Sequence, residues 1–194
     1  MSSDNKITAL DLPIPARDEL PEGFQKYFNK CDEKLGMVPN VLTSYSQNVA
    51  QLDVFSRFYN EIMFGESEIT TLEKEMIAVV VSSQNHCYYC LTAHGAAVRE
   101  YSGDPVLGEL MVMNYRAADL SPRHRAMLDF AYKLTKQPDQ IIEDDRQKLR
   151  DAGFSDRGIW DIANVIGFYN MTNRVAGAVE MQPNIEYHAS HRGN

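Results

Sequence analysis

Two cysteines and a histidine, Cys87, Cys90 and His94, lie close together in the segment NHCYYCLTAH. If this segment is helical, His94 lies about 20° around the helix axis from Cys87 and about 40° from Cys90, so all three share one face. A thiol at a helix N-terminus has a lowered pKa, and only the thiolate attacks. An imidazole can take the proton, and a second thiol can trap an oxidised first one as a disulfide. The spacing therefore suits a thiol redox cycle.

Three other interpretations compete with a redox pair. A structural zinc site could use the same three residues with Cys31 or His86 as fourth ligand, although neither stands at a usual zinc spacing. The two cysteines could instead be small buried hydrophobic residues, and His94 alone would be an ordinary helix residue. For Cys31 we prefer a packing role, because it lies on the apolar stripe of a helix with no second thiol nearby in sequence.

Glu75 is a further candidate for acid–base chemistry. Glu73 follows Thr70 by three residues, which is the capping-box pattern, so the start of a helix explains Glu73. Glu75 lies directly before the apolar run at residues 77–81, where a partly desolvated carboxylate would have a raised pKa and accept a proton near neutral pH. On spacing alone, a solvated glutamate in the first helical turn is the better interpretation.

Helical periodicity dominates the chain and predicts an all-α fold, with no strand pattern. Expected helices cover residues 21–35, 48–64, 87–100, 105–114, 121–135 and 144–152; another begins at Thr70 and ends before a break at 83–86. A last helix begins after Ser155 and should bury residues Ile159, Trp160, Ile162, Val165, Ile166 and Tyr169. Residues 1–18 form a polar arm, 19–182 a single helical domain with the motif segment at 70–102, and 183–194 a polar tail that could be loose.

Two further groups of residues could reach the site. The aromatic stripe of Phe55, Phe58 and Tyr59 is expected in the core, although it could also line an apolar pocket. The polar residues Asn170, Asn173 and Arg174 of the last helix could reach the site or a subunit interface. Helix capping or a salt bridge is the commoner role for such a group.

Composition excludes several classes of function. The 194 residues carry a net charge of −8, which argues against a nucleic-acid-binding surface. No apolar run approaches the roughly 20 residues needed to span a bilayer, and the N-terminal residues lack a secretory signal pattern. We therefore expect a cytoplasmic protein whose three cysteines are reduced, where a CxxC pair is more often catalytic or metal-binding than structural.

The motif as a whole resembles a known family. The motif consists of Glu75, eleven further residues and then Cys87-x-x-Cys90-x-x-x-His94, within the segment LEKEMIAVVVSSQNHCYYCLTAHG. It is similar to the motif of the alkylhydroperoxidase D-like branch of the carboxymuconolactone decarboxylase family. The stretch GMVPNVL at 36–42 and residues 144–174 resemble its peroxidase-related subgroup, so the likeness extends from about residue 19 to 180. It implies an all-helical bundle that assembles into trimers or hexamers. It also implies an antioxidant peroxidase that reduces alkyl hydroperoxides or peroxide without haem, flavin or another cofactor.

The resemblance also implies roles and partners. Cys90 would be the peroxidatic thiol and Cys87 the resolving thiol, with Glu75 and His94 as the proton relay. The helix-terminus argument favours Cys87 as the more acidic thiol, so the order of the two stays open. The implied partners are a hydroperoxide and an external dithiol of lipoyl or thioredoxin type, with no nucleic acid and no membrane.

One position departs from the family pattern. Alkylhydroperoxidase D has a histidine where this chain has Tyr89, and a phenol that titrates near pH 10 cannot shuttle protons as an imidazole does. The proton relay is then shortened, unless His86 partly replaces the missing histidine. The simpler expectation for His86 is an exposed position in a loop. Lactone decarboxylases of the family lack the CxxC pair, so decarboxylation is disfavoured. A disulfide oxidoreductase acting on proteins and a non-catalytic metal-binding helical module remain as alternatives.

Overall fold

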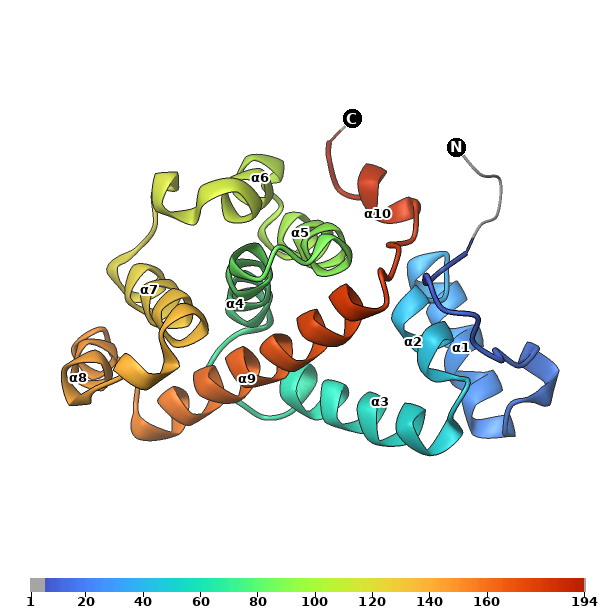
Figure 1. Cartoon of the computed structure of the whole chain (residues 1–194). Helices are drawn as coiled ribbons and strands as arrows, with labels where there is room; N and C mark the ends of the chain where they lie inside the picture. Colours follow the sequence, from blue (N-terminus) through green and yellow to red (C-terminus); the bar gives the residue numbers. More distant parts are fainter. Residues whose placement is uncertain (1–5, 194) are drawn as a thin grey trace.

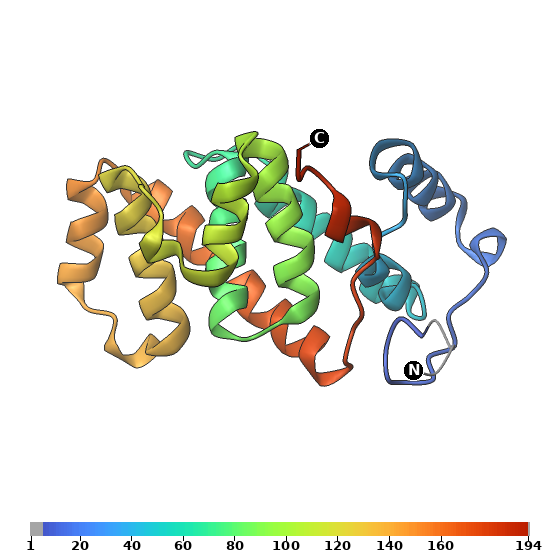
Figure 2. The same cartoon turned by 90° about the horizontal axis from the view of Figure 1, so that it is seen from above.

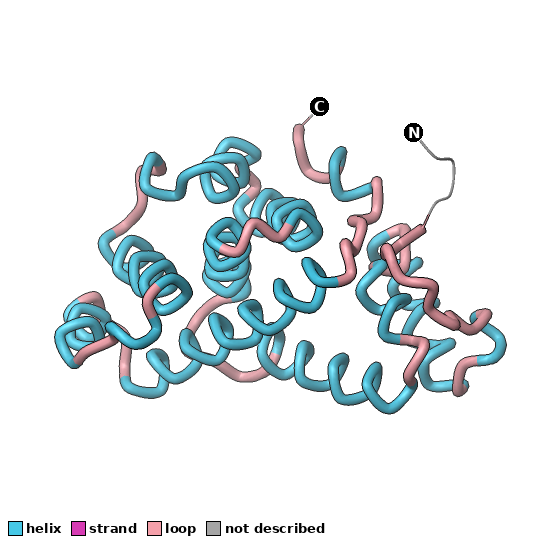
Figure 3. The backbone as a smooth tube through the Cα atoms, in the orientation of Figure 1, coloured by secondary structure: helices cyan, strands magenta, loops and turns pink. Residues whose placement is uncertain are grey.

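The computed structural model describes residues 6–193, and within that range the chain consists of helices and loops without a strand (Figure 3). The 3₁₀ helices are η1 (Arg17–Glu19), η2 (Tyr115–Ala117) and η3 (Pro138–Gln140). The α-helices are α1 (Glu22–Leu35), α2 (Asn40–Tyr45), α3 (Val49–Phe64), α4 (Thr71–Gln84), α5 (Tyr88–Ser102), α6 (Pro105–Asn114), α7 (Pro122–Lys136), α8 (Glu143–Asp151), α9 (Asp156–Ala178) and α10 (Glu186–Ala189). The predicted all-α class is confirmed.

Local capping signals set most helix ends where the sequence predicts them. Gly36 ends α1 with a φ of +71°, a left-handed conformation that glycine adopts without strain. At the start of α4, the Thr70 hydroxyl accepts from the Glu73 backbone N–H at 3.2 Å, and the Glu73 carboxylate accepts from the Thr70 backbone N–H at 2.8 Å. The Ser121 and Ser155 hydroxyls cap α7 and α9 by accepting from a backbone N–H three residues later, without the reciprocal bond. Short-range chemistry therefore places the helices.

Helix α4 forms the centre of the molecule. It contacts α3, α5, α6, α7 and α9, and every side chain from Met76 to Val81 is fully buried. The long helix α9 runs beside α3 and along one side of α4 and α5 (Figures 1 and 2). Because α4 is apolar all round, other helices can cover it on every side.

The structure differs from the sequence analysis at two places. Helix α2, which directly follows Pro39, is absent from the predicted helices; the restriction that proline places on residue 38 does not extend past the proline itself. Trp160 is 67% exposed, although Ile159 and Ile162 on either side are buried. It lies on the outer face of α9, so its apolar character alone did not indicate its orientation.

The polar tail is held against the helices. The buried guanidinium of Arg99 on α5 donates hydrogen bonds to the backbone carbonyls of Tyr187 and Ser190, both at 2.9 Å. The Asn184 side chain accepts from the Asn40 backbone N–H at 2.7 Å. Thus the expectation of a loose tail is wrong for residues 183–193. Residues 1–5 of the expected arm and Asn194 lie outside the described residues.

None of the helices described between residues 6 and 193 is long and apolar enough to cross a membrane.

Candidate active site

A sharp turn between α4 and α5 positions the two cysteines. Cys87 is the N-cap of α5, Cys90 lies in its first turn, and His94 follows one turn later. The Cys87 backbone N–H donates to the Ser82 carbonyl at 3.0 Å, and His86 adopts a φ of +53° at the bend. His86 itself is exposed, as expected for a loop residue. The turn therefore places the N-terminus of α5, with its thiols, beside the end of the buried helix α4.

Glu75 and His94 form a direct pair. The His94 Nδ1 lies 2.7 Å from the Glu75 Oε2, and the two side chains are 13% and 3% exposed. The interpretation of Glu75 as a solvated glutamate is therefore wrong, because α4 is covered by other helices along its length. The edge of the His94 ring packs on Tyr169, at 4.6 Å between ring centroids. A carboxylate on Nδ1 fixes the ring orientation and leaves Nε2 for proton transfer.

The two thiols have opposite pKa directions. The pKa of Cys87 is lowered from 9.0 to about 7, first because the Cys90 thiol donates a hydrogen bond to the thiolate. The Cys90 backbone N–H, the charge of His94 and the Asn173 amide lower it further, against the cost of burial. The pKa of Cys90 is raised well above its ordinary value, first by its hydrogen bond with Cys87 and then by burial. The structure therefore favours Cys87 as the resting thiolate, as the helix-terminus argument predicts.

A polar network from α4 and α9 supports the thiols. The Asn173 amide, which is buried, donates to the Ser82 hydroxyl at 3.0 Å and accepts from the Asn85 side chain at 3.0 Å. Asn173 and Ser82 both stabilise thiolate charge at Cys90. From the sequence we considered a position at the site for Asn173 but preferred capping or a salt bridge, and we missed Ser82. Its signal was a hydroxyl next to an otherwise apolar buried run.

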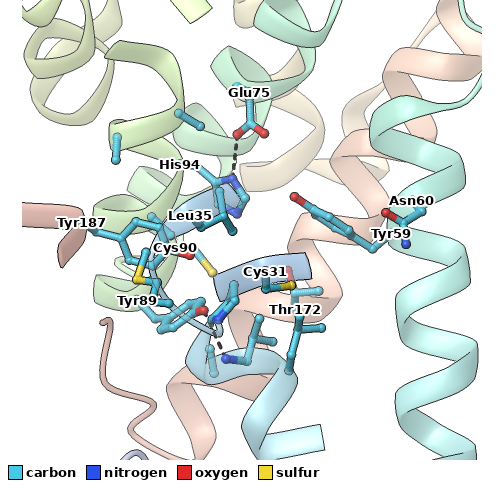
Figure 4. A pocket seen from close by; sticks show the side chains of 18 of the residues that line it. Cys31, Leu35, Tyr59, Asn60, Glu75, Tyr89, Cys90, His94, Thr172 and Tyr187 are labelled. Atoms are coloured by element: carbon cyan, nitrogen blue, oxygen red, sulfur yellow. Dashed lines mark hydrogen bonds and ion pairs between the residues drawn. The ribbon is translucent and has the colours of Figure 1, made fainter. Parts of the chain in front are cut away.

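An apolar cavity of about 770 Å³ opens in front of the motif (Figure 4). Glu75, Cys90 and His94 line it, whereas Cys87 does not. Charged side chains of Lys30, Lys34 and Glu100 lie at its wall, together with the aromatic residues Tyr27, Tyr45, Phe55, Tyr59, Phe64, Tyr89, Tyr101, Phe168, Tyr169 and Tyr187. A small apolar molecule in this cavity would meet the Cys90 sulfur and the imidazole together.

Several candidate residues take different places from those the sequence suggested. Phe55 and Tyr59 line the cavity, but Phe58 is half-exposed and packs edge-on against Phe168 at 5.5 Å. Cys31 on α1 lines the same cavity as Cys90, which its position in sequence could not indicate, and burial raises its pKa. Tyr89 is buried.

The Tyr89 hydroxyl accepts a hydrogen bond from the Val41 backbone N–H at 3.1 Å. Burial raises the pKa of Tyr89 well above its ordinary value, so the phenol keeps its proton. Its role here is packing and positioning rather than proton transfer.

Across residues 6–193, no three His, Cys, Asp or Glu side chains are placed to hold a metal ion together. Cys87, Cys90 and His94 are thus not joined by Cys31 or His86 in a zinc-ligand arrangement.

Fold and site together define an all-helical protein with a buried thiol pair, a carboxylate–imidazole couple and an aromatic cavity. Residues 52–133 match the model of the Carboxymuconolactone decarboxylase family. A crystal structure of an uncharacterized peroxidase-related protein from Silicibacter sp. TM1040 is 60% identical, with a TM-score of 0.95, over 99% of this chain and 100% of that one. A crystal structure of an uncharacterized peroxidase-related protein with an alkylhydroperoxidase AhpD core, from Ralstonia eutropha JMP134, is 35% identical, with a TM-score of 0.92, over 97% of this chain and 98% of that one.

The chain therefore belongs to the carboxymuconolactone decarboxylase family, among its AhpD-like peroxidase-related proteins. The debrominase Bmp8 in complex with 2,3,4-tribromopyrrole shares the fold, with a TM-score of 0.77 at 20% identity over 97% of both chains. No curated protein matches the chain in sequence.

Proposed function

We propose that this chain is a thiol peroxidase that reduces organic hydroperoxides through Cys90 and Cys87. The observation that carries the proposal is that one sulfur of a hydrogen-bonded thiol pair lines the same apolar cavity as the Glu75–His94 couple. The cavity supplies a place for the organic group of the substrate, and the couple supplies a proton. Membership of the AhpD-like peroxidase-related group agrees with this chemistry.

The two cysteines take different parts in the proposed reaction. Cys87 carries the resting charge, but Cys90 is the sulfur that faces the cavity. A proton shift along the hydrogen bond from Cys90 to Cys87 places the thiolate where the substrate is. Because the substrate can reach the Cys90 sulfur from the cavity, we assign Cys90 as the attacking thiol and Cys87 as the resolving thiol.

In the proposed cycle a hydroperoxide oxidises the thiol pair and a dithiol reduces it again. The Cys90 thiolate attacks the distal oxygen of ROOH, the O–O bond breaks, and the departing alkoxide takes a proton from imidazolium His94 to give ROH. Cys90 is now a sulfenic acid. The Cys87 sulfur displaces its hydroxyl group, which leaves as water with the proton from Cys87, and forms the Cys87–Cys90 disulfide. An external dithiol then reduces this disulfide and is itself oxidised.

Burial of the pair favours a small oxidant over a protein disulfide. Both cysteines are 3% exposed, so a folded protein substrate cannot bring its own disulfide to them without opening the site. A hydroperoxide can enter the cavity and meet Cys90 directly. Disulfide exchange with proteins is therefore the weaker alternative.

Turnover with an alkyl hydroperoxide and an excess of small dithiol tests the proposal. Cys87→Ala and Cys90→Ala should each abolish catalytic turnover. Cys31→Ser, at a third cysteine that lines the cavity outside the CxxC pair, should still turn over. Full peroxidase activity in a Cys87→Ala/Cys90→Ala double variant would refute the proposal. Faster disulfide formation with an oxidised protein than with cumene hydroperoxide would instead support the disulfide-exchange alternative.

We also propose that the chain acts in the cytoplasm as a homo-oligomer, either a trimer or a hexamer. Helix α6 presents Val106 and Met113, which are large, apolar and exposed, and such side chains commonly lie in interfaces between subunits. Light scattering on the purified protein measures the copy number, and a monomer at all concentrations would contradict the proposal.

A further inference from the structure

Tyr59 lies across the cavity from Cys90 and His94 (Figure 4). It lies on α3, and its ring is held by Phe55, Phe64 and Phe168, with centroid distances of 6.4, 5.8 and 6.1 Å. Figure 4 shows the hydroxyl directed away from α3 into the cavity, toward the space in front of His94 and Cys90. Three aromatic contacts leave the ring little freedom, so the direction of its hydroxyl is set before a substrate arrives.

The Tyr59 hydroxyl lacks a protein partner in the described part of the chain. Two other tyrosines of the same cavity are paired: Tyr89 accepts from the Val41 backbone N–H, and Tyr169 donates to the sulfur of Met63 at 3.3 Å. Tyr59 makes no such bond among residues 6–193. A polar group aimed into an apolar cavity costs free energy unless something binds it. A ligand with an acceptor oxygen would supply the missing partner.

Electrostatics set this hydroxyl apart from that of Tyr45, another tyrosine of the cavity. Burial raises the pKa of Tyr59 well above its ordinary value, and the negative charge of Glu75 raises it further. For Tyr45 burial alone raises the pKa. Tyr59 therefore lies close enough to the Glu75–His94 couple to feel its charge, and it keeps its proton throughout the reaction.

We infer that Tyr59 is a catalytic residue whose hydroxyl donates a hydrogen bond to the departing oxygen of the hydroperoxide. This inference rests on the proposed peroxidase function. When the Cys90 sulfur bonds to the distal oxygen, the electron pair of the O–O bond moves to the proximal oxygen, which becomes an alkoxide. Negative charge that develops in a transition state is stabilised most by hydrogen-bond donors that are already in place. Tyr59 supplies the hydrogen bond, His94 supplies the proton, and Tyr59 is unchanged at the end.

Tyr59→Phe removes one oxygen and keeps the ring, and Tyr45→Phe is the matched control in the same cavity. We expect kcat/KM for cumene hydroperoxide to fall roughly 10- to 100-fold in Tyr59→Phe and by a clearly smaller factor in Tyr45→Phe, which removes a hydroxyl from another wall of the same cavity. Both variants should keep the unfolding midpoint of the wild type, because neither hydroxyl bonds to a protein group within residues 6–193. The pKa of Cys87, measured by ultraviolet titration, should also be unchanged in Tyr59→Phe. If Tyr59 only maintained the structure of the site, its replacement would shift this pKa.

A series of ring-substituted cumene hydroperoxides gives a second readout. They differ in the basicity of the alcohol that leaves and little in size. The decrease in kcat/KM caused by Tyr59→Phe should become larger as the basicity of the departing alkoxide increases, since the hydrogen bond stabilises a more basic alkoxide more strongly. Three results would overturn the inference while the proposed peroxidase function stands. They are an unchanged kcat/KM in Tyr59→Phe, a decrease in kcat/KM that is the same for every hydroperoxide of the series, and an equally large decrease in Tyr45→Phe. A wild type that consumes no hydroperoxide would overturn the proposed function as well.

Discussion

The acidity of Cys87 depends first on its neighbour, so replacing Cys90 should change how Cys87 titrates. In a Cys31→Ser background, Cys90→Ala removes the thiol that donates to the Cys87 thiolate and leaves Cys87 as the last thiol of the chain. The pKa of Cys87 should then rise from about 7 back toward its ordinary value of 9.0. Burial, which disfavours the thiolate, is opposed only by the weaker contributions of the Cys90 backbone N–H, His94 and Asn173.

The size of the effect follows from these two values. A thiol with a pKa of about 7 is half ionised at pH 7, whereas one with a pKa of 9.0 is about 1% ionised, so the thiolate population of Cys87 falls about 50-fold. The more basic thiolate is intrinsically about 6- to 10-fold more nucleophilic. Alkylation of Cys87 at about pH 7 should therefore slow by about 5- to 8-fold in the variant. At about pH 10 the order reverses, and the variant should react about 6- to 10-fold faster.

Thiolate absorbance in the ultraviolet gives the titration midpoint, and chloroacetamide labelling read by peptide mass spectrometry gives the rate at Cys87. The Cys31→Ser protein is the control for both. The reasoning is refuted if Cys87 titrates near 9 in that control, or if Cys90→Ala leaves the midpoint where it was. A rate ratio that is constant between pH 7 and pH 10 would also contradict it.

The reduced protein should gain stability as the pH rises from about 7 to 9, by at most about 2.7 kcal/mol, because Cys87 ionises first in the folded state. Urea unfolding of wild type and Cys87→Ser at both pH values measures this gain, and parallel pH dependences would contradict it. Glu75→Leu should lower kcat/KM roughly 10- to 100-fold, because a charge-assisted hydrogen bond to His94 is worth about 1.5–3 kcal/mol; unchanged kinetics would show that the couple is dispensable. Gly108→Ala should cost about 1–3 kcal/mol, since a methyl group there meets the side chains and backbone of α5. Gly167→Ala, which meets no heavy atom within 4 Å, is the control, and equal melting temperatures for the two variants would contradict the prediction.

The sequence predicts features that depend on neighbours in the chain. Thr70 with Glu73 indicates where α4 begins, and the spacing of Cys87, Cys90 and His94 already places the three on one helix. These features are local because a cap or a shared face involves residues within two helical turns. The all-α class follows from many such local patterns together.

Features that depend on packing between distant segments could not be predicted in this way. Glu75 is buried because five other helices pack around α4, and its bond to His94 joins two helices. Tyr59 and Cys31 reach the cavity from helices far from the motif in sequence. Trp160 is the reverse case: we expected it to be buried because it is apolar, but it lies on the exposed face of its helix. Residue type and periodicity indicate candidates, whereas tertiary contacts decide which of them meet.

A single turnover with cumene hydroperoxide tests the central claim most directly. The fully reduced protein is mixed with one equivalent of the hydroperoxide per chain, without added dithiol, and the products are identified by peptide mass mapping and by quantifying the alcohol. We predict one equivalent of cumyl alcohol and a Cys87–Cys90 disulfide, with Cys31 still a free thiol. Unconsumed hydroperoxide, or alcohol formed while Cys87 and Cys90 both remain thiols, would contradict the account.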